Sequence, residues 1–261
     1  MRALEIAATG MEAQQTRVET ISNNLANMNT TAYNPRRAEF ADLHYQQVRQ
    51  PGSVNAADGS ILPAGVQLGL GVRTAAVSME VEQGALRSTG GELDIAIEGD
   101  GYFEVELPSG AAAYTRDGGL KRTGEGQLVT VEGYAVVPGV TIPADARSVE
   151  INANGDVVAI FADQVDGEVL GRLTLATFVN DKGLEALGGN LFAETAASGQ
   201  PNVGDPGVDG RGTLRQGFLE QSGVDPVREI TELIEAQRGY EMNAKVISAA
   251  DEMLGATVRI R

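Results

Sequence analysis

The sequence predicts an α+β fold, with long N- and C-terminal helices paired as a coiled-coil domain and a central, mostly antiparallel all-β domain. Two observations carry this prediction. Apolar residues recur every seven positions at both ends of the chain, which is typical of helices that bury a narrow seam against other helices. Short alternating segments separated by glycine turns fill the middle, which is typical of antiparallel strands.

The first helix is predicted over residues 1–28, because neither a proline nor a run of β-branched residues interrupts that stretch. Gln14 is the one polar side chain within its seven-residue repeat. Asparagines and threonines accumulate over residues 23–31 and compete for backbone hydrogen bonds, so they should end the helix before Pro35. We expect a self-assembly seam on this helix that consists of Leu4, Ala7, Met11, Val18, Ile21, Leu25 and Met28.

The last helix should open at Asp225 and Pro226, an acidic N-cap followed by a proline at the first helical position. Its seam should consist of Ile230, Leu233, Tyr240, Ala244, Ile247, Leu254 and Val258. Each end helix is about 28–34 residues long, more than twice the usual globular length. That length favours assembly with copies of the chain; the alternative is two ordinary core helices of one α+β domain.

We divide the chain into an N-terminal helix over 1–35, which pairs with 226–261, an extended linker over 36–85, a central β domain over 86–220 and a C-terminal helix over 221–261. Residues 36–48 fit either a short helix or an extended linker. Residues 199–213 are predicted to form a return loop. Strands are predicted from residue 72 and over 93–97, 102–106, 113–115, 127–129, 135–137, 149–151, 157–161, 169–178 and 192–194.

Composition excludes several classes of protein. The net charge is −16, of which residues 41–225 carry −15, and such an acidic chain does not suit a nucleic-acid surface. The absence of cysteine rules out disulfides and thiolate sites. No stretch approaches the roughly 20 apolar residues of a membrane span, so we expect no membrane insertion. No secretory signal is visible, which by itself would indicate a cytoplasmic protein.

The sequence offers little for catalysis. His44 is the only histidine, and without cysteine it cannot complete a common zinc site. The carboxylates of residues 92–106 have the spacing of a solvated strand face. We therefore predict a protein that is not an enzyme, with no catalytic, metal-binding or cofactor-binding residues and no cofactor. A soluble β-rich binding or hydrolytic domain with helical arms is the alternative.

The residues from Ser22 to Tyr33 (SNNLANMNTTAY) resemble the signature of bacterial flagellar rod and hook axial proteins. In that family a glycine usually stands where this chain has Ala32, and a lysine where it has Asn34-Pro35. The resemblance extends to 38–43, 84–103, 114–118, 219–227 and 236–244. The signature positions are Asn23, Asn24, Asn27, Asn29, Thr30, Thr31 and Tyr33.

The resemblance implies a structural subunit of the flagellar distal rod. Such a subunit would leave the cytoplasm through the flagellar export channel without a cleaved signal peptide, which replaces the cytoplasmic prediction. It would polymerise into a rigid helical tube that spans the periplasm, acts as a drive shaft and conducts the export of more distal subunits. Its partners would be copies of itself, adjacent rod and hook proteins, and the peptidoglycan-layer and outer-membrane ring proteins that act as a bushing.

One segment distinguishes the alternatives within the family. Residues 49–72 look like the stretch specific to distal-rod members, and we expect it to stiffen the tube by bridging subunits. A proximal rod subunit or a hook-type subunit is the rival within the family. The proposed stiffening residues are Gln50, Pro51, Gly52, Leu62, Pro63, Gly65, Val66, Leu68 and Gly69.

Overall fold

The computed structural model describes residues 2–49, 65–161 and 167–259, with side chains described as far as residue 256 at the C-terminal end. The chain forms two compact units. The first contains Met1–Ala26, Arg36–Met79 and Asp225–Arg261, and the second contains Asn27–Pro35 and Glu80–Val224. The α+β prediction is confirmed, because one helix lies at each end of the chain and antiparallel strands lie between them.

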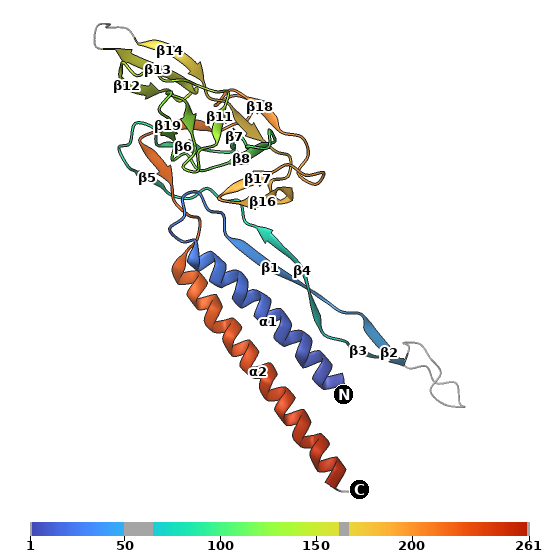
Figure 1. Ribbon diagram of the computed structural model, residues 1–261. Helices are drawn as coiled ribbons and strands as arrows, with labels where there is room; N and C mark the ends of the chain where they lie inside the picture. The colour runs from blue at the N-terminus through green and yellow to red at the C-terminus, as the bar shows by residue number, and fades with distance from the viewer. Residues whose placement is uncertain (1, 50–64, 162–166, 260–261) are drawn as a thin grey trace. The chain divides into compact units, whose positions relative to one another are not determined.

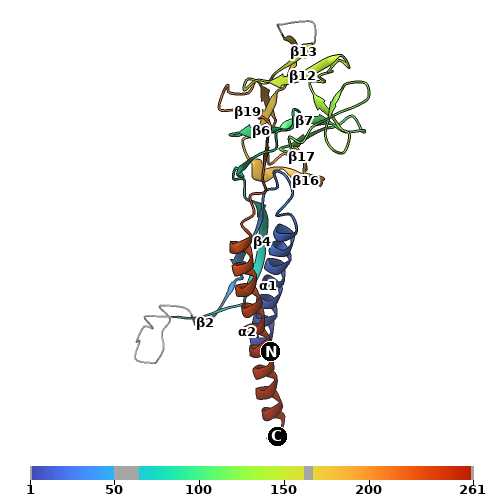
Figure 2. The same cartoon turned by 90° about the vertical axis from the view of Figure 1, so that its left-hand side faces the viewer.

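In the first unit, helix α1 (Arg2–Ala26) and helix α2 (Pro226–Arg259) run antiparallel side by side (Figures 1 and 2). Helix α2 begins as predicted: Pro226 is its first residue, and the Asp225 carboxylate accepts hydrogen bonds from the backbone N–H of Val227 at 2.9 Å and of Arg228 at 3.4 Å. The pairing brings the two ends of the chain together. Coiled-coil packing of the two predicted seams stays a prediction.

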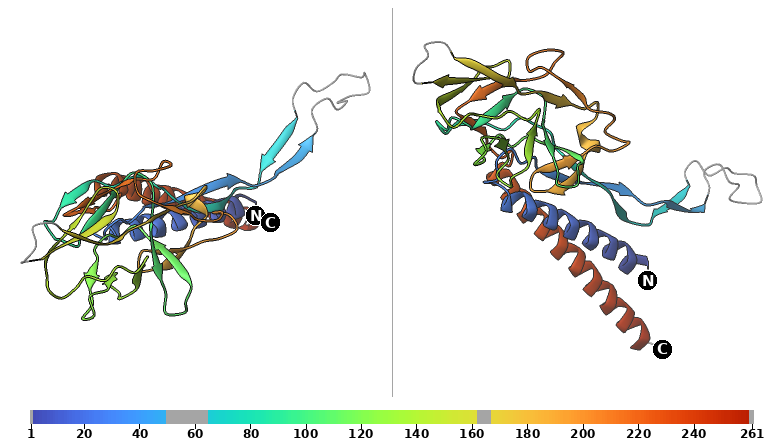
Figure 3. Two further views of the ribbon diagram at one scale, coloured as in Figure 1. Left: turned by 90° about the horizontal axis from the view of Figure 1, so that it is seen from above. Right: turned by 45° about the horizontal axis from the view of Figure 1, so that its top comes forward.

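A two-stranded antiparallel ribbon completes the first unit, and Figure 3 shows its course. Strand β1 (Arg36–Asp42) pairs with β4 (Val72–Met79), and β2 (Tyr45–Arg49) pairs with β3 (Val66–Gly69). A bulge between Glu39 and Phe40 shifts the register of the first pair. Residues 36–48 are therefore strands, so the extended reading of this segment holds and the helical reading is wrong.

The second unit is built from antiparallel strand pairs. One seven-stranded sheet has the order β16-β17-β8-β7-β11-β10-β9, and a three-stranded sheet has the order β12-β13-β14. The remaining pairs are β15-β18, β19-β6 and β20-β5, and a short 3-10 helix covers Asp181–Gly183. The strands are β5 Leu86–Ser88, β6 Ile95–Glu98, β7 Phe103–Glu106, β8 Ala112–Thr115, β9 Lys121–Arg122, β10 Leu128–Val129, β11 Ala135–Val137, β12 Ala146–Ile151, β13 Asp156–Phe161, β14 Glu168–Arg172, β15 Leu175–Thr177, β16 Glu185–Gly188, β17 Leu191–Ala193, β18 Asn202–Gly204, β19 Thr213–Gln216 and β20 Phe218–Glu220.

The core of this unit comes from buried residues of its strands, which alternate along β7, as in a half-buried antiparallel sheet, and are consecutive along β6. Ile95 and Ile97 on β6 and Phe103 and Val105 on β7 are completely buried. Turn residues fix the hairpins: Gly155 has φ +90° and its N–H donates to Asn152 O between β12 and β13. The described part of the chain contains no helix that is long and apolar enough to cross a membrane.

Candidate assembly surfaces

The contact between α1 and α2 uses small and polar side chains rather than a continuous apolar seam. Gly10 lies against the Asn243 amide, and Gly239 lies against the Gln14 side chain. Arg17 forms ion pairs with Glu232 at 3.4 Å and Glu235 at 3.6 Å. On α1 the contact residues recur at alternating spacings of three and four, which is the repeat of a coiled-coil contact face. They are Gly10, Gln14, Arg17 and Asn24, and the buried Ala7 and Ile21 continue the same spacing.

The predicted seam residues of α1 divide into two groups. Ala7 and Ile21 are buried, and Leu4, Met11, Val18 and Leu25 are half-buried. At 100° per residue, these four half-buried residues lie beside the contact face of α1, on the flank next to Gly10 and Gln14. Met28 is exposed and belongs to the second unit. The assembly role of the whole set stays a prediction.

Much of the apolar surface of α2 is exposed. Of the predicted seam, Leu233, Ala244 and Ile247 are half-buried, whereas Ile230, Tyr240 and Leu254 are exposed; the side chain of Val258 lies outside the described residues. The residues of α2 that are buried in this unit are instead Ala236 and Ala250. Sequence periodicity located the helix, but the apolar stripe it marks is not the face that α1 covers. Further exposed apolar residues are Val227, Ile234, Met242, Val246 and Met253.

Asn24, near the end of α1, forms hydrogen bonds with two other elements of the first unit. Its side chain is 2% exposed, donates to Arg36 O at 2.8 Å and accepts from Arg36 N–H at 2.9 Å, as a neighbouring strand would. Its amide also lies 3.3 Å from the Glu229 carboxylate of α2. One side chain therefore joins α1, the start of β1 and α2. The sequence placed Asn24 in the signature but did not indicate this role.

Asn23 is exposed on α1, and the rest of the signature lies in the second unit, along residues 27–35. Thr30 Oγ1 donates to Asn27 Oδ1 at 3.1 Å, and Thr31 O accepts from the Asn190 side chain. Gly223 N–H donates to Tyr33 O at 2.9 Å. The first bond is local, and the other two hold the signature segment to turns and loops that lie far along the chain.

Ala32 is buried with φ +52°, a left-handed conformation that costs a non-glycine residue about 1–2 kcal/mol. Its N–H donates to Glu220 O at 2.9 Å. The geometry gives a physical reason for a glycine at this position, because glycine adopts positive φ without strain.

A buried ion pair lies beside this segment. Arg116 Nε donates to Glu220 Oε2 at 2.6 Å, and the side chains are 5% and 3% exposed. Arg116 also donates to Gly101 O at 3.2 Å and Gly99 O at 2.7 Å, while Glu220 Oε1 accepts from Gly84 N–H at 2.8 Å. All three guanidinium nitrogens and both carboxylate oxygens of the pair thus form hydrogen bonds. Charge pattern along the sequence did not reveal this pair, because its members are 104 residues apart.

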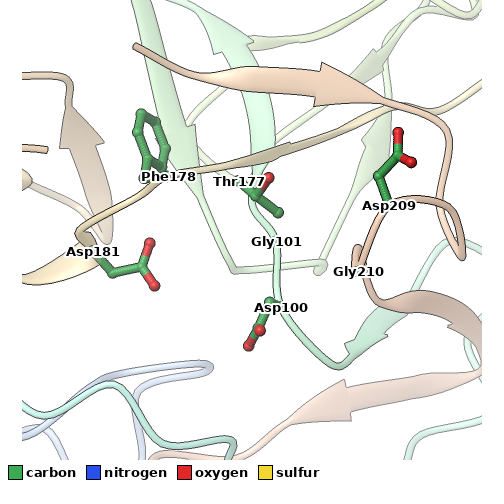
Figure 4. Close-up of a pocket in the computed structure, with 7 residues that line it drawn as sticks. All are labelled: Asp100, Gly101, Thr177, Phe178, Asp181, Asp209 and Gly210. Atoms are coloured by element: carbon green, nitrogen blue, oxygen red, sulfur yellow. The ribbon is translucent and has the colours of Figure 1, made fainter. Parts of the chain in front are cut away.

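The second unit also contains a small polar pocket of about 210 Å³, shown in Figure 4. It is lined by Asp100, Gly101, Thr177, Phe178, Asp181, Asp209 and Gly210. Burial, with a smaller contribution from the charge of Asp100, raises the pKa of the Asp181 carboxyl above its usual value. Among the residues that the structure describes, no group of three or more histidine, aspartate or glutamate side chains is arranged to hold a metal ion.

The predicted stiffening stretch is described only in its second part. Gly65 is half-buried, and Val66, Leu68 and Gly69 lie on β3 with their side chains or backbone exposed. On β2, Tyr45, which pairs with Gly69, and Val48, at the register shift between Gln47 and Arg49, are exposed as well. The ribbon therefore presents an apolar surface in this unit. Gln50, Pro51, Gly52, Leu62 and Pro63 lie outside the described residues.

The chain resembles known protein families over three of its segments. Three family models match: the flagella basal body rod protein over residues 4–33, the flagellar hook protein FlgE/F/G D1 domain over 96–159, and the flagellar basal body rod FlgEFG protein C-terminal over 215–260. They cover the α1 helix, much of the second unit and α2. The class is that of flagellar rod and hook subunits, as the sequence predicted.

Relatives identify the family within that class. The chain is 51% identical to the flagellar basal-body rod protein FlgG of Caulobacter vibrioides over all of both chains. It is 51% identical to the FlgG of Agrobacterium fabrum over 97% of each chain, and 37% identical to that of Bacillus subtilis over 100% of this chain and 99% of the other. The chain belongs to the FlgG family of flagellar basal-body rod proteins, and it is a structural subunit of the flagellar distal rod. The relatives are structural rod proteins rather than enzymes.

Proposed function

We propose that copies of this chain assemble through the half-buried apolar residues of α1 and the exposed apolar residues of α2 into a rigid helical tube that spans the periplasm. The tube acts as a drive shaft, and its lumen conducts the export of more distal subunits. The observation that carries the proposal is the exposure of apolar side chains along α2, where Ile234 is 44% and Met242 is 62% exposed. Soluble monomers rarely expose so many apolar side chains on one helix, and such a surface is typical of a contact with another protein.

The position of these side chains supports contacts with other copies. At 100° per residue, Val227, Ile230 and Ile234 lie on the side of α2 opposite Ala236 and Asn243, which face α1. Met242, Val246 and Met253 lie on its flank. Burial of one such side chain contributes about 1.5–3 kcal/mol, so several per subunit would drive polymerisation. The charge pattern agrees, since residues 1–40 are neutral and 226–261 carry only −1.

The remaining parts take supporting roles in the proposal. The acidic second unit forms the outer wall, turned toward the peptidoglycan-layer and outer-membrane ring proteins that act as a bushing. The ribbon and the stretch up to Gly69 bridge neighbouring copies and stiffen the tube. Adjacent rod and hook proteins are the end-to-end partners, and the subunit is exported without a cleaved signal peptide. The role is mechanical, with no catalytic step.

Negative-stain electron microscopy of the purified chain over a concentration series tests the proposal. Straight tubes that disappear when residues 1–28 or 227–261 are removed would support it. Curved tubes would favour a hook-type subunit, and a monomer at every concentration, even with a basal-body template, would overturn it.

A pair of point variants makes the test sharper. Ile234→Asp places a charge in the exposed apolar surface, and we expect at least a tenfold rise in the concentration needed for assembly because one buried isoleucine is lost. The control Ile234→Val keeps an apolar side chain at the same exposed position and should assemble normally. Both monomers should show unchanged thermal melts. Equal assembly of the two variants would refute the role of the α2 surface.

A further inference from the structure

Specific contacts between α1 and α2 must determine the register in which the two helices pair. Helix α1 has 25 residues and α2 has 34, so α1 can slide by one seven-residue repeat toward the C-terminal end of α2 without losing helix overlap. Buried apolar residues lie fourteen residues, or two repeats, apart on each helix (Ala7 and Ile21 on α1, Ala236 and Ala250 on α2), so their spacing alone does not select one register. Length and apolar pattern therefore leave the register open.

Two reciprocal contacts distinguish the observed register from its neighbours. Gly10 of α1 faces Asn243 of α2: a Cβ on Gly10 would lie 2.8 Å from the Asn243 Nδ2 atom. Gly239 of α2 faces Gln14 of α1: a Cβ there would lie 3.1 Å from the Gln14 Cδ atom. Each helix thus supplies one glycine and one amide side chain, four positions apart, and each amide occupies the space that the opposing glycine leaves. We name these four residues the glycine–amide contacts.

A slide of one repeat would destroy both contacts. Gln14 would then face the branched side chain of Val246 instead of Gly239, and Gly10 would face Ala250. The Gln14 amide also gains little stability where it is, because its Oε1 atom is buried and accepts no hydrogen bond within the described chain. A buried polar side chain that stabilises little is the kind of residue that specifies register in paired helices.

We propose that the glycine–amide contacts set the register of α1 against α2. Through that register they align the apolar surface of α1 with that of α2, so that every copy presents the same composite surface. This last consequence rests on the proposed assembly into a tube, whereas the register itself is a property of one chain. The two can be tested separately.

The chain contains no cysteine, so introduced pairs report on register without background. Ala7→Cys with Val246→Cys joins positions that are level in the observed register, and Ala7→Cys with Met253→Cys joins positions that are level after a slide of seven residues. The two registers differ by about 10 Å along the helix. A short bifunctional thiol reagent, applied to the purified full chain and to isolated basal bodies, distinguishes them. A shift in the mobility of the monomer band identifies bonds within one chain.

With the contacts intact, we expect the first pair to cross-link at least tenfold faster than the second. Removal of both amides in Gln14→Ala/Asn243→Ala should reduce that preference to less than threefold. The matched control Gln15→Ala/Gln237→Ala removes two exposed amides from the same helices, and its cross-linking preference should stay at tenfold or more. An unchanged preference in the first double variant would overturn the proposal, as would failure of the first pair to cross-link in either preparation.

Discussion

The buried ion pair of Arg116 and Glu220 allows a quantitative prediction for Glu220→Ala. The substitution leaves the guanidinium, 5% exposed, without a counter-charge and removes the acceptor of Gly84 N–H. Loss of one partner from a buried pair costs about 3–5 kcal/mol. For a chain of this size that corresponds to a fall in melting temperature of roughly 10 °C.

The second step of the test removes both charges. In Arg116→Met/Glu220→Ala no isolated charge remains, so the double variant should be more stable than Glu220→Ala alone by about 1–3 kcal/mol. It should still fall below the native protein, because the carbonyl oxygens of Gly99 and Gly101 lose the donors of Arg116.

Urea unfolding of the full chain, followed by circular dichroism, measures both steps. The control is Glu98→Ala, which breaks a pair with Arg215 at 4.0 Å between side chains that are about half exposed and should cost less than about 1 kcal/mol. A loss below about 1 kcal/mol for Glu220→Ala, or a double variant less stable than Glu220→Ala, would refute the argument that an uncompensated buried charge dominates.

Three further predictions concern single positions. At Ala32, with φ +52°, Ala32→Val should destabilise by about 2 kcal/mol while Ala32→Gly changes stability by less than about 1 kcal/mol, measured by urea unfolding; a tolerated valine would contradict the left-handed geometry. Asn24→Ala leaves the backbone N–H and C=O of Arg36 without their partner and should cost about 1–3 kcal/mol in the same assay, whereas an unchanged midpoint would show that water replaces the side chain. Burial and the charge of Asp100 raise the Asp181 pKa, so ionisation lowers stability as the pH rises through that pKa. Asp181→Asn should therefore melt at a higher temperature than the native chain at pH 7, and the two melting temperatures should converge below the usual aspartate pKa. A variant that melts at a lower temperature than the native chain at pH 7 would contradict the prediction.

The sequence predicted the helices and most strands of the second unit because their signals are local. Asp225-Pro226 marked the start of α2, and the predicted strand over 135–137 has the observed bounds. The predicted strand over 169–178 is instead two strands, β14 and β15, because the chain leaves one partner strand and joins another near Leu173. Strand β18 lies within the predicted return loop, where Val203 pairs with Ala176, a contact that periodicity does not reveal.

The candidate surfaces were only partly predictable for the same reason. Seven-residue spacing located the apolar stripes, but the face that α1 presents to α2 depends on which residues are small enough for close approach, such as Gly10 and Gly239. The role of Asn24 depends on Arg36, whose backbone position is a property of the folded chain. The buried pair of Arg116 and Glu220 required the three-dimensional course of β20.

The discontinuity of the first unit has a consequence for the order of events during synthesis. Its α1 helix is translated about 200 residues before α2, its partner, whereas residues 80–224 of the second unit form one uninterrupted stretch. At 5–20 residues per second, α1 waits on the order of 10–40 s for the helix that covers its contact face. The segment that completes the first unit therefore leaves the ribosome after the whole of the second unit, and a product truncated before α2 can form the strands of the second unit without forming the helix pair.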